Sequence, residues 1–153
     1  MSSGVVVIGL GNAFRRDDGV GIAAATALGD CAGGFIRVVT DVSDSVSLLD
    51  AWDGAVFAVV IDGAVTAGSE PGKIRQCGPD ELAVTHGRTS SHRLDLAQAI
   101  ALGRALERMP DALVLLVVDI ADVGYGEGLT PAVAAAVPKL VAMAAAEINR
   151  HVR

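Results

Sequence analysis

Short runs of apolar residues recur along this sequence, and each ends at or beside a glycine or an aspartate. The clearest runs are Val5–Leu10, Ala55–Ile61 and Leu113–Asp119. A segment that is apolar at nearly every position, and not only at alternate ones, is typical of a strand covered on both faces of a parallel sheet. These runs therefore predict the central strands of an α/β fold.

Segments with helical spacing and helix-capping residues separate the predicted strands. The expected helices cover residues 19–29, 43–52, 94–109 and 130–149, and two shorter strands cover 35–40 and 73–77. Alternating strands and helices form a sheet between two helical layers, because each crossover returns the next strand parallel to its neighbour. The sequence therefore predicts a single three-layer domain over residues 1–153, with a twisted, mostly parallel sheet and helices on both faces. An apolar stripe in the third helix is expected to face the core, through Leu94, Ala97, Ala101 and Ala105.

Charge and composition argue against several classes of protein. The formal net charge is -6, whereas proteins that bind DNA or RNA neutralise phosphates with clustered basic residues. No apolar stretch reaches the roughly 18 residues of a membrane span, and no basic leader precedes Val5. Cys31 and Cys77 form neither a Cys-x-x-Cys pair nor a disulfide framework. We therefore expect a cytoplasmic protein that binds neither nucleic acid nor membrane.

Carboxylates follow the predicted strands at the points where the strands end. They are Asp17 and Asp18 after the first strand, Asp41 after the second, Asp62 after the third, and Asp119 and Asp122 around the last. Because the carboxyl ends of parallel strands meet at one edge of a sheet, these acids are expected to share a rim. Like charges held together raise one another's pKa unless a cation neutralises them, so the pattern favours a metal. His92 would supply a nitrogen ligand, which leaves coordination positions open for water or for a ligand from another protein.

Several of these residues also have a structural interpretation. Asp17 is expected to serve as a helix cap or a first-turn charge, and position alone gives Asp18 the same interpretation. Asp62 stands where a buried strand is expected to meet a loop, which favours a role in a site. Asp119 is compatible both with a site acid and with a hydrogen-bonded structural acid. The remaining histidines, His86 and His151, are assigned no site role.

Part of a dinucleotide-binding fingerprint follows the first predicted strand. Gly9 and Gly11 match the first two glycines of G-x-G-x-x-G, and Asp41 stands where a ribose-binding acid would belong. The third glycine is replaced by Phe14. The paired acids just beyond it would also place negative charge at the helix N-terminus that should bind a pyrophosphate. Nucleotide binding is therefore the weaker alternative.

Five segments, in the order in which they occur, resemble the hydrogenase maturation proteases. Gly9–Asn12 with Arg16–Gly21 is similar to the family's opening, in which G-x-G-N is followed by a pair of acids and a glycine. The later similarities are Val60–Ala64 for the third-strand acid, Pro71–Arg75 for a short strand, Ser91–Leu94 for the histidine motif and Gly128–Pro131 for the start of the last helix. The resemblance spans nearly the whole chain.

The resemblance implies an endopeptidase that binds the nickel-loaded precursor of a [NiFe]-hydrogenase large subunit and removes a C-terminal peptide from it. Two acids and a histidine bind metal in that family. By position these residues are Asp18, Asp62 and His92, which we expect to act both as metal ligands and as catalytic residues. The nickel is expected to arrive with the substrate, and other divalent metals are expected to substitute for it in vitro.

Other functions remain open at this point. A non-catalytic metal or nucleotide binding protein could use the same fold, and so could a chaperone that binds the precursor without cutting it. The particular hydrogenase, the bond that is cut and the oligomeric state do not follow from the sequence.

One segment departs from the family pattern. After the second strand the family usually shows an acid followed by Gly-Gly and Ser or Thr, whereas Asp41 is followed here by Val42–Ser45. The loss of these glycines removes conformational freedom from a loop that is expected to meet the substrate. The departure therefore bears on the identity of the substrate and not on the fold. Asp119 and Asp122 also stand where many relatives carry Gln or Pro, which adds an acid to the rim.

Overall fold

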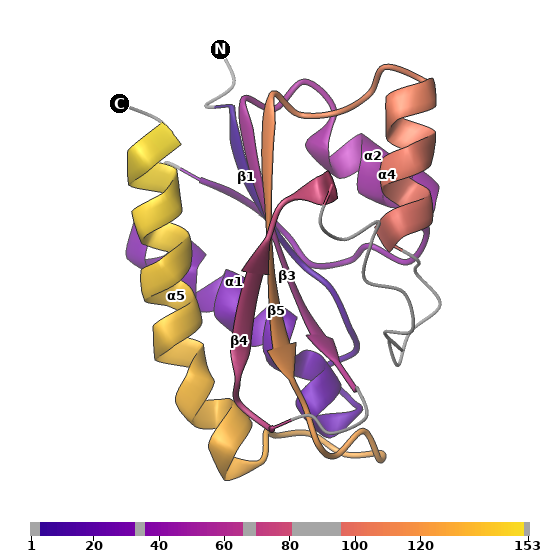
Figure 1. The fold of residues 1–153 in the computed structure, drawn as a ribbon. Coiled ribbons are helices and arrows are strands. Elements are labelled where there is room, and N and C mark those ends of the chain that lie inside the picture. Colours follow the sequence, from indigo (N-terminus) through magenta and orange to yellow (C-terminus); the bar gives the residue numbers. More distant parts are fainter. Residues whose placement is uncertain (1–3, 33–35, 66–69, 81–95, 152–153) are drawn as a thin grey trace.

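Residues 4–32, 36–65, 70–80 and 96–151 are described by the structure, a computed structural model (Figure 1). The strands in these segments form one sheet in the order β2-β1-β3-β5-β4. Their bounds are β1 Val5–Gly9, β2 Arg37–Val39, β3 Phe57–Ala64, β4 Ile74–Cys77 and β5 Ala112–Asp119. Neighbouring strands pair in parallel except β4, which is antiparallel to β5. The prediction of a mostly parallel α/β sheet is therefore confirmed.

Two helical layers cover the sheet (Figure 1). The helices are a short 3-10 helix η1 Arg16–Gly19, α1 Val20–Ala32, α2 Ser45–Trp52, α4 Leu96–Ala105 and α5 Pro131–His151. α1 and α5 pack on one face of the sheet, and α2 and α4 pack on the other. Each interface encloses its own apolar cluster, one that includes Val59 and Leu140 and one that includes Val60 and Trp52. The predicted helices on both faces are confirmed.

β3 extends further than its apolar pattern indicates. The expected strand ends at Ile61, but the ladder to β5 continues to Ala64, which pairs with Asp119. Because side chains alternate along a strand, Asp62 lies on the same face as Val60, which is the face that α2 and α4 cover. Asp62 is therefore held within the strand and not by a loop that follows it.

α4 buries a different stripe from the predicted one. The predicted Ala97, Ala101 and Ala105 are exposed, and Leu94 lies outside the described residues. The buried residues of α4 are Ala99, Ile100 and Gly103. A Cβ atom at Gly103 would lie 2.9 Å from Cδ2 of Leu49 on α2, so this glycine lets the two helices approach closely. The prediction was wrong because alanines occur on several faces of this helix and are too small to indicate which one is buried.

α5 is the one helix in the described part of the chain that is long and apolar enough to cross a membrane. Its Val133, Leu140 and Ile148 are buried in the cluster that α1 and the sheet share. An apolar helix that packs on a sheet meets the same criterion of length and composition, so the criterion alone does not indicate a membrane span.

Candidate functional site

The carboxyl ends of β1, β3 and β5 lie together at one end of the sheet, the lower end in Figure 1. We use the word edge for this end of the strands and not for the outer strands of the sheet. The segment after β1 forms a turn and η1 at this edge, and the loop after β5 passes over the same edge before α5 begins. The aspartates buried here are at most 5% exposed, and they are Asp17, Asp18, Asp62 and Asp119. Ligands of open α/β sheets bind at this kind of edge. It is therefore the candidate site.

Glycines hold the start of α1 directly against the ends of β1 and β3. A Cβ atom at Gly9 would lie 2.4 Å from the carbonyl oxygen of Gly21, and one at Gly21 would lie 2.3 Å from that of Ile61. Both distances are too short for any side chain, so only glycine permits these contacts. Gly21 lies about one helical turn beyond Asp18, and η1 itself contacts β3. Packing of the helix on the strands thus explains two glycines of the motif and fixes Asp18 beside the strand that carries Asp62.

The turn between β1 and η1 closes around Asp18. The backbone N–H of Asn12 donates to a carboxylate oxygen of Asp18 at 2.9 Å, and the N–H of Phe14 donates to the side-chain oxygen of Asn12 at 2.9 Å. In a nucleotide-binding turn such N–H groups point at the phosphates. Here the side chains of Asp18 and Asn12 accept these hydrogen bonds, which disfavours the nucleotide alternative.

Asp62 belongs to a row of residues that crosses three strands. Its partner on β5 is Val117, and Val117 is in turn paired with Arg75 on β4. Residues that are directly opposite in a sheet share a face, so Asp62 and Arg75 lie on the same face with backbones about 10 Å apart. The row places a buried acid and a basic residue close to the candidate edge.

Asp119 is neutralised within the fold. Its carboxylate accepts a hydrogen bond from Nη2 of Arg75 at 3.1 Å and one from the backbone N–H of Glu70 at 3.2 Å. The side chain of Asp119 is 1% exposed, so the ion pair with Arg75 compensates for the burial of its charge. These contacts favour the second of the two interpretations that the sequence leaves open, in which Asp119 is a hydrogen-bonded structural acid.

The remaining acids of the rim do not join into one cluster. Asp122 is exposed and pairs with Arg16 at 3.6 Å, and Asp41 is exposed beyond β2. Among the residues that the structure describes, no three His, Cys, Asp or Glu side chains could hold a metal ion. Asp119 and Asp122 are thus each paired with an arginine, and the expectation that the carboxylates at the rim favour a metal stays a prediction.

The structure describes two of the three predicted ligands. Asp18 and Asp62 are buried at the same edge of the sheet, whereas His92 lies outside the described residues, as does His86. The assignment of Asp18, Asp62 and His92 to one site therefore stays a prediction. His151 stacks on Phe57 with ring centroids 4.1 Å apart, near the amino end of β3 and away from the candidate edge.

Asp17 ties η1 to the loop that follows β5. Its buried carboxylate accepts hydrogen bonds from the backbone N–H groups of Ala121, Asp122 and Thr130, at 2.7 to 3.1 Å, and from the hydroxyl of Thr130. Burial raises the pKa of Asp17, but these hydrogen bonds outweigh burial and hold the pKa below its usual range. Asp17 is an acid in the first turn of η1, as predicted, but the predicted helix cap is wrong, because its hydrogen-bond donors belong to a distant loop and not to its own helix.

Replacing Asp17 by alanine is expected to lower the free energy of unfolding by about 2–3 kcal/mol, because three backbone donors and one hydroxyl lose their acceptor. Denaturant unfolding at pH 7 measures this loss. A carboxyl group whose pKa is lower in the folded state stabilises the fold above its unfolded pKa, and the contribution disappears as the pH falls through the folded pKa. The difference between parent and variant should therefore shrink below about pH 4.

Asp122→Ala is the matched control for that experiment. It removes an exposed carboxylate from the same loop, and its loss should change the unfolding free energy by less than about 1 kcal/mol. Equal stability of the parent and Asp17→Ala at pH 7 would contradict the structural role of Asp17.

Two positioning residues carry little signal in the sequence pattern. From the sequence, Thr130 is expected to cap the helix that begins at Pro131. In the structure its N–H and hydroxyl both donate hydrogen bonds to Asp17. From the sequence, Arg75 is one residue of a short predicted strand. In the structure it neutralises the charge of Asp119. One feature of the sequence could have identified Arg75. It is a basic residue on a short strand, and that strand is expected to pair with a strand that ends in an acid.

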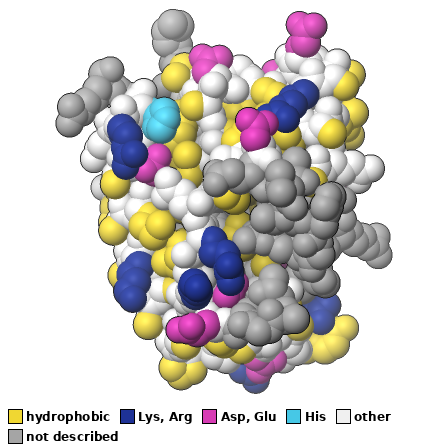
Figure 2. Space-filling model, in the orientation of Figure 1, with side chains coloured by type: hydrophobic (Ala, Val, Ile, Leu, Met, Phe, Trp, Pro, Cys, Tyr) yellow, Lys and Arg dark blue, Asp and Glu magenta, His cyan; other side chains and the backbone are white. Residues whose placement is uncertain are grey.

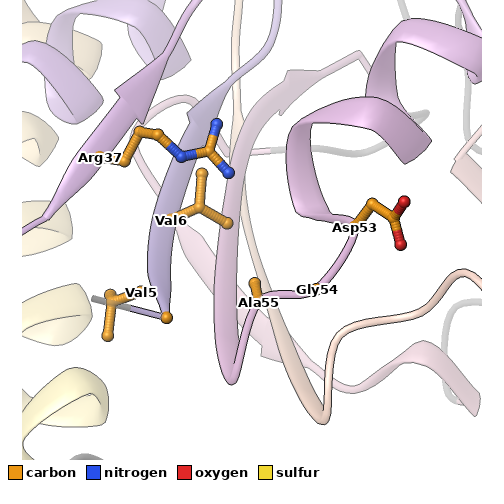
Figure 3. Close-up of a pocket in the computed structure, with 7 residues that line it drawn as sticks. Val5, Val6, Arg37, Asp53, Gly54 and Ala55 are labelled. Atoms are coloured by element: carbon orange, nitrogen blue, oxygen red, sulfur yellow. The ribbon is translucent and has the colours of Figure 1, made fainter. Parts of the chain in front are cut away.

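A separate hollow lies at the opposite edge of the sheet (Figure 3). It has a volume of about 180 Å³ and opens between the start of β1 and the turn before β3. Figure 3 shows the carboxylate of Asp53 turned away from the guanidinium of Arg37. Arg37 donates to the carbonyl oxygen of Ala51 at 2.7 Å, and Asp53 pairs with Arg108 at 3.2 Å. The charged side chains that line this hollow thus already have partners within the fold, and we do not place the functional site there.

Comparison with known proteins finds a matching family model and similar solved structures. Residues 42–147 match the model of the HycI family, described as hydrogenase maturation protease. The fold is similar to that of the [NiFe] hydrogenase maturation protease HybD from Thermococcus kodakarensis, with a TM-score of 0.76 and 24% identity over 93% of this chain and 97% of that chain. It is also similar to the hydrogenase maturating endopeptidase HybD from E. coli, with a TM-score of 0.81 and 22% identity over 95% of this chain and 92% of that chain.

A more distant structure has the same fold. The hydrogenase 2 maturation peptidase from a Thaumarchaeota archaeon aligns with a TM-score of 0.66 and 17% identity over 94% of this chain and 97% of that chain. No curated protein matches the sequence. The family match includes the positions of Asp62 and His92 but begins after Asp18, so the role of Asp18 depends on the motif alone.

Proposed function

The chain belongs to the hydrogenase maturation protease family, and on that premise we propose that it removes a C-terminal peptide from the nickel-loaded precursor of a [NiFe]-hydrogenase large subunit. The observation that carries the proposal is the pair of buried carboxylates, Asp18 and Asp62, at the carboxyl edge of the sheet. The two acids come from η1 and β3, which backbone contacts hold together. Acids held on rigid elements suit a preorganised site for a cation.

The nickel in this proposal belongs to the substrate. Asp18, Asp62 and His92 together offer two carboxylates and one imidazole, an incomplete set of ligands that the metal's existing ligands in the precursor would complete. One oxygen of Asp18 is already oriented by the N–H of Asn12. A site with these ligands would bind the precursor tightly only when its metal is present, so the cut would follow nickel insertion.

Hydrolysis of the peptide bond requires an activated water near the scissile carbonyl. A carboxylate within hydrogen-bond reach of that water can accept its proton. The same acids that meet the metal are the candidates for this step, and we therefore propose that Asp18, Asp62 and His92 serve both purposes.

A processing assay tests the proposal. Purified protein mixed with the precursor from the same genome should shorten the nickel-loaded form and leave the nickel-free form intact, and a gel shift with mass spectrometry of the released peptide measures this. Equal cutting of both forms would remove the nickel-sensing role. Binding of the loaded precursor without any cutting would instead favour the chaperone alternative.

A further inference from the structure

The two most exposed large hydrophobic side chains in the described part of the chain lie at the candidate edge. Phe14 is 64% exposed and Tyr125 is 86% exposed, in a protein whose aromatic content is only 3%. By contrast, Trp52 and Phe57 are completely buried. Aromatic and arginine side chains are enriched where proteins bind one another, so this exposure indicates a contact surface.

Both aromatic residues stand on segments that are joined to each other. The carbonyl oxygen of Phe14 accepts a hydrogen bond from the N–H of Gly126 at 2.8 Å, and the carbonyl oxygen of Gly126 accepts one from the N–H of Arg16 at 2.9 Å. The guanidinium of Arg15 lies over the ring of Tyr125, 5.3 Å from its centroid. These contacts hold Phe14, Arg15 and Tyr125 on one preformed surface, hereafter the aromatic rim, which lowers the entropy loss on binding.

A hollow of about 290 Å³ is lined in part by Ala13 and Arg16, which flank Phe14 and Arg15 of the aromatic rim in the sequence. Its apolar lining includes Ile22, Ala23 and Leu129, and its charged lining consists of Arg16 and Glu127. Arg16 is already paired with Asp122, so its positive charge is not free to bind a phosphate, and the apolar lining suits the side chain and neutral backbone of a polypeptide. Gly19, the residue after Asp18, also lines the hollow, so the hollow lies beside η1, the element that carries Asp18.

We propose that the aromatic rim and this hollow form the docking surface for the hydrogenase precursor, with one apolar side chain of the precursor inside the hollow. The identity of the partner rests on the proposed function, whereas the location of the surface rests on the exposure and contacts of the rim. Three features favour a protein partner over a small ligand: the exposed aromatic side chains, the lack of a free positive charge in the hollow and its position beside η1, which carries Asp18. The face shown in Figure 2 likewise mixes hydrophobic, acidic and basic side chains and shows no broad surface of one charge.

Variants at the rim and in the hollow test this proposal. Phe14→Ala and Tyr125→Ala remove the exposed rings, and Ala23→Leu narrows the hollow while keeping a strong helix former on α1. Each should weaken binding of the purified, nickel-loaded precursor about tenfold, and should raise KM in the processing assay more than it changes kcat. Calorimetry measures the binding, and processing rates at several precursor concentrations separate KM from kcat.

Matched controls come from exposed residues elsewhere. Leu106→Ala removes a side chain that is 54% exposed and follows α4 at the other end of the sheet. Thr26→Leu adds an apolar side chain to an exposed position of α1, about one turn beyond Ala23. Both controls should bind and cut the precursor like the parent.

The outcomes separate this inference from the proposed function. Unchanged binding in all three test variants, or no binding of the precursor by the parent, would overturn the docking surface. If the parent binds the precursor in a manner that these variants weaken, but never cuts it, the docking surface stands and the endopeptidase proposal fails.

Discussion

Replacing His92 by alanine is expected to abolish processing of the nickel-loaded precursor, with a loss of at least about 100-fold in kcat/KM. In the proposed function His92 is the nitrogen ligand, and imidazole binds nickel better than the hard carboxylates that would remain. A gel-shift assay with the purified precursor measures the loss. Circular dichroism melting of the same variant shows whether the fold survives.

Two further variants make the His92 experiment specific. His92→Gln restores polarity and approximate size without a good nickel ligand, so it should be nearly as inactive as His92→Ala. His86→Ala removes the neighbouring histidine outside the motif and should process normally. Full processing by His92→Ala would end the metal-sensing role of this residue, and an unfolded His92→Ala would show that its role is structural.

Replacing Asp62 by asparagine is expected to remove both metal binding and processing. We expect the isolated parent to bind Ni²⁺, Zn²⁺ or Cd²⁺ weakly, because three ligands leave an incomplete shell. Asp62→Asn keeps the size of the side chain within β3 but loses the negative charge that a cation requires. Titration calorimetry with each metal, together with the processing assay, measures the effect, and Asp62→Ala provides a second variant without any oxygen ligand.

Asp119→Asn is the matched control for Asp62. It changes a second buried aspartate at the same edge, but one that Arg75 already neutralises. This variant should lose stability, since Arg75 then lacks its anionic partner, while the heats of metal binding persist. Heats from Asp62→Asn and Asp62→Ala that equal those of the parent would remove Asp62 from the site.

The sheet could be predicted because burial on both faces leaves a direct trace in the sequence. β1, β3 and β5 are apolar at nearly every position, so their residues alone indicate central parallel strands. Local capping is equally visible, since α5 begins at Pro131 as predicted. These features depend on residues that are close together in the chain, and sequence patterns report such neighbours well.

The arrangement of the candidate site could be predicted only in part. The sequence places acids at the correct edge, but the hydrogen bond from Thr130 to Asp17 joins residues 113 positions apart. The spacing of residues along the chain does not reveal such a pair. It also does not show that Arg75, on the antiparallel outer strand β4, reaches Asp119. Sequence could therefore name the acids and give Asp17 a structural role, but it could not identify the partners that neutralise Asp119 and Asp122.

The departure after Asp41 has a local physical explanation. Asp44 accepts a hydrogen bond from the N–H of Ser47 at 2.8 Å, and Ser47 Oγ accepts one from the N–H of Asp44 at 3.1 Å. This capping box begins α2 in the segment where the resemblance to the family led us to expect glycines. The helix predicted over residues 43–52 is thus confirmed, with Asp44 as its cap, and the expected effect on the identity of the substrate stays a prediction.

The close approach of α1 to the sheet also affects how such a protein can evolve. Gly9 and Gly21 leave no space for even a methyl group, so natural selection should eliminate nearly every mutation at these positions. Phe14 and Tyr125 project into solvent, and mutations there can accumulate without loss of the fold. A lineage could therefore acquire a new client protein by drift at the aromatic rim, while the acids inherited from its ancestor remain in place.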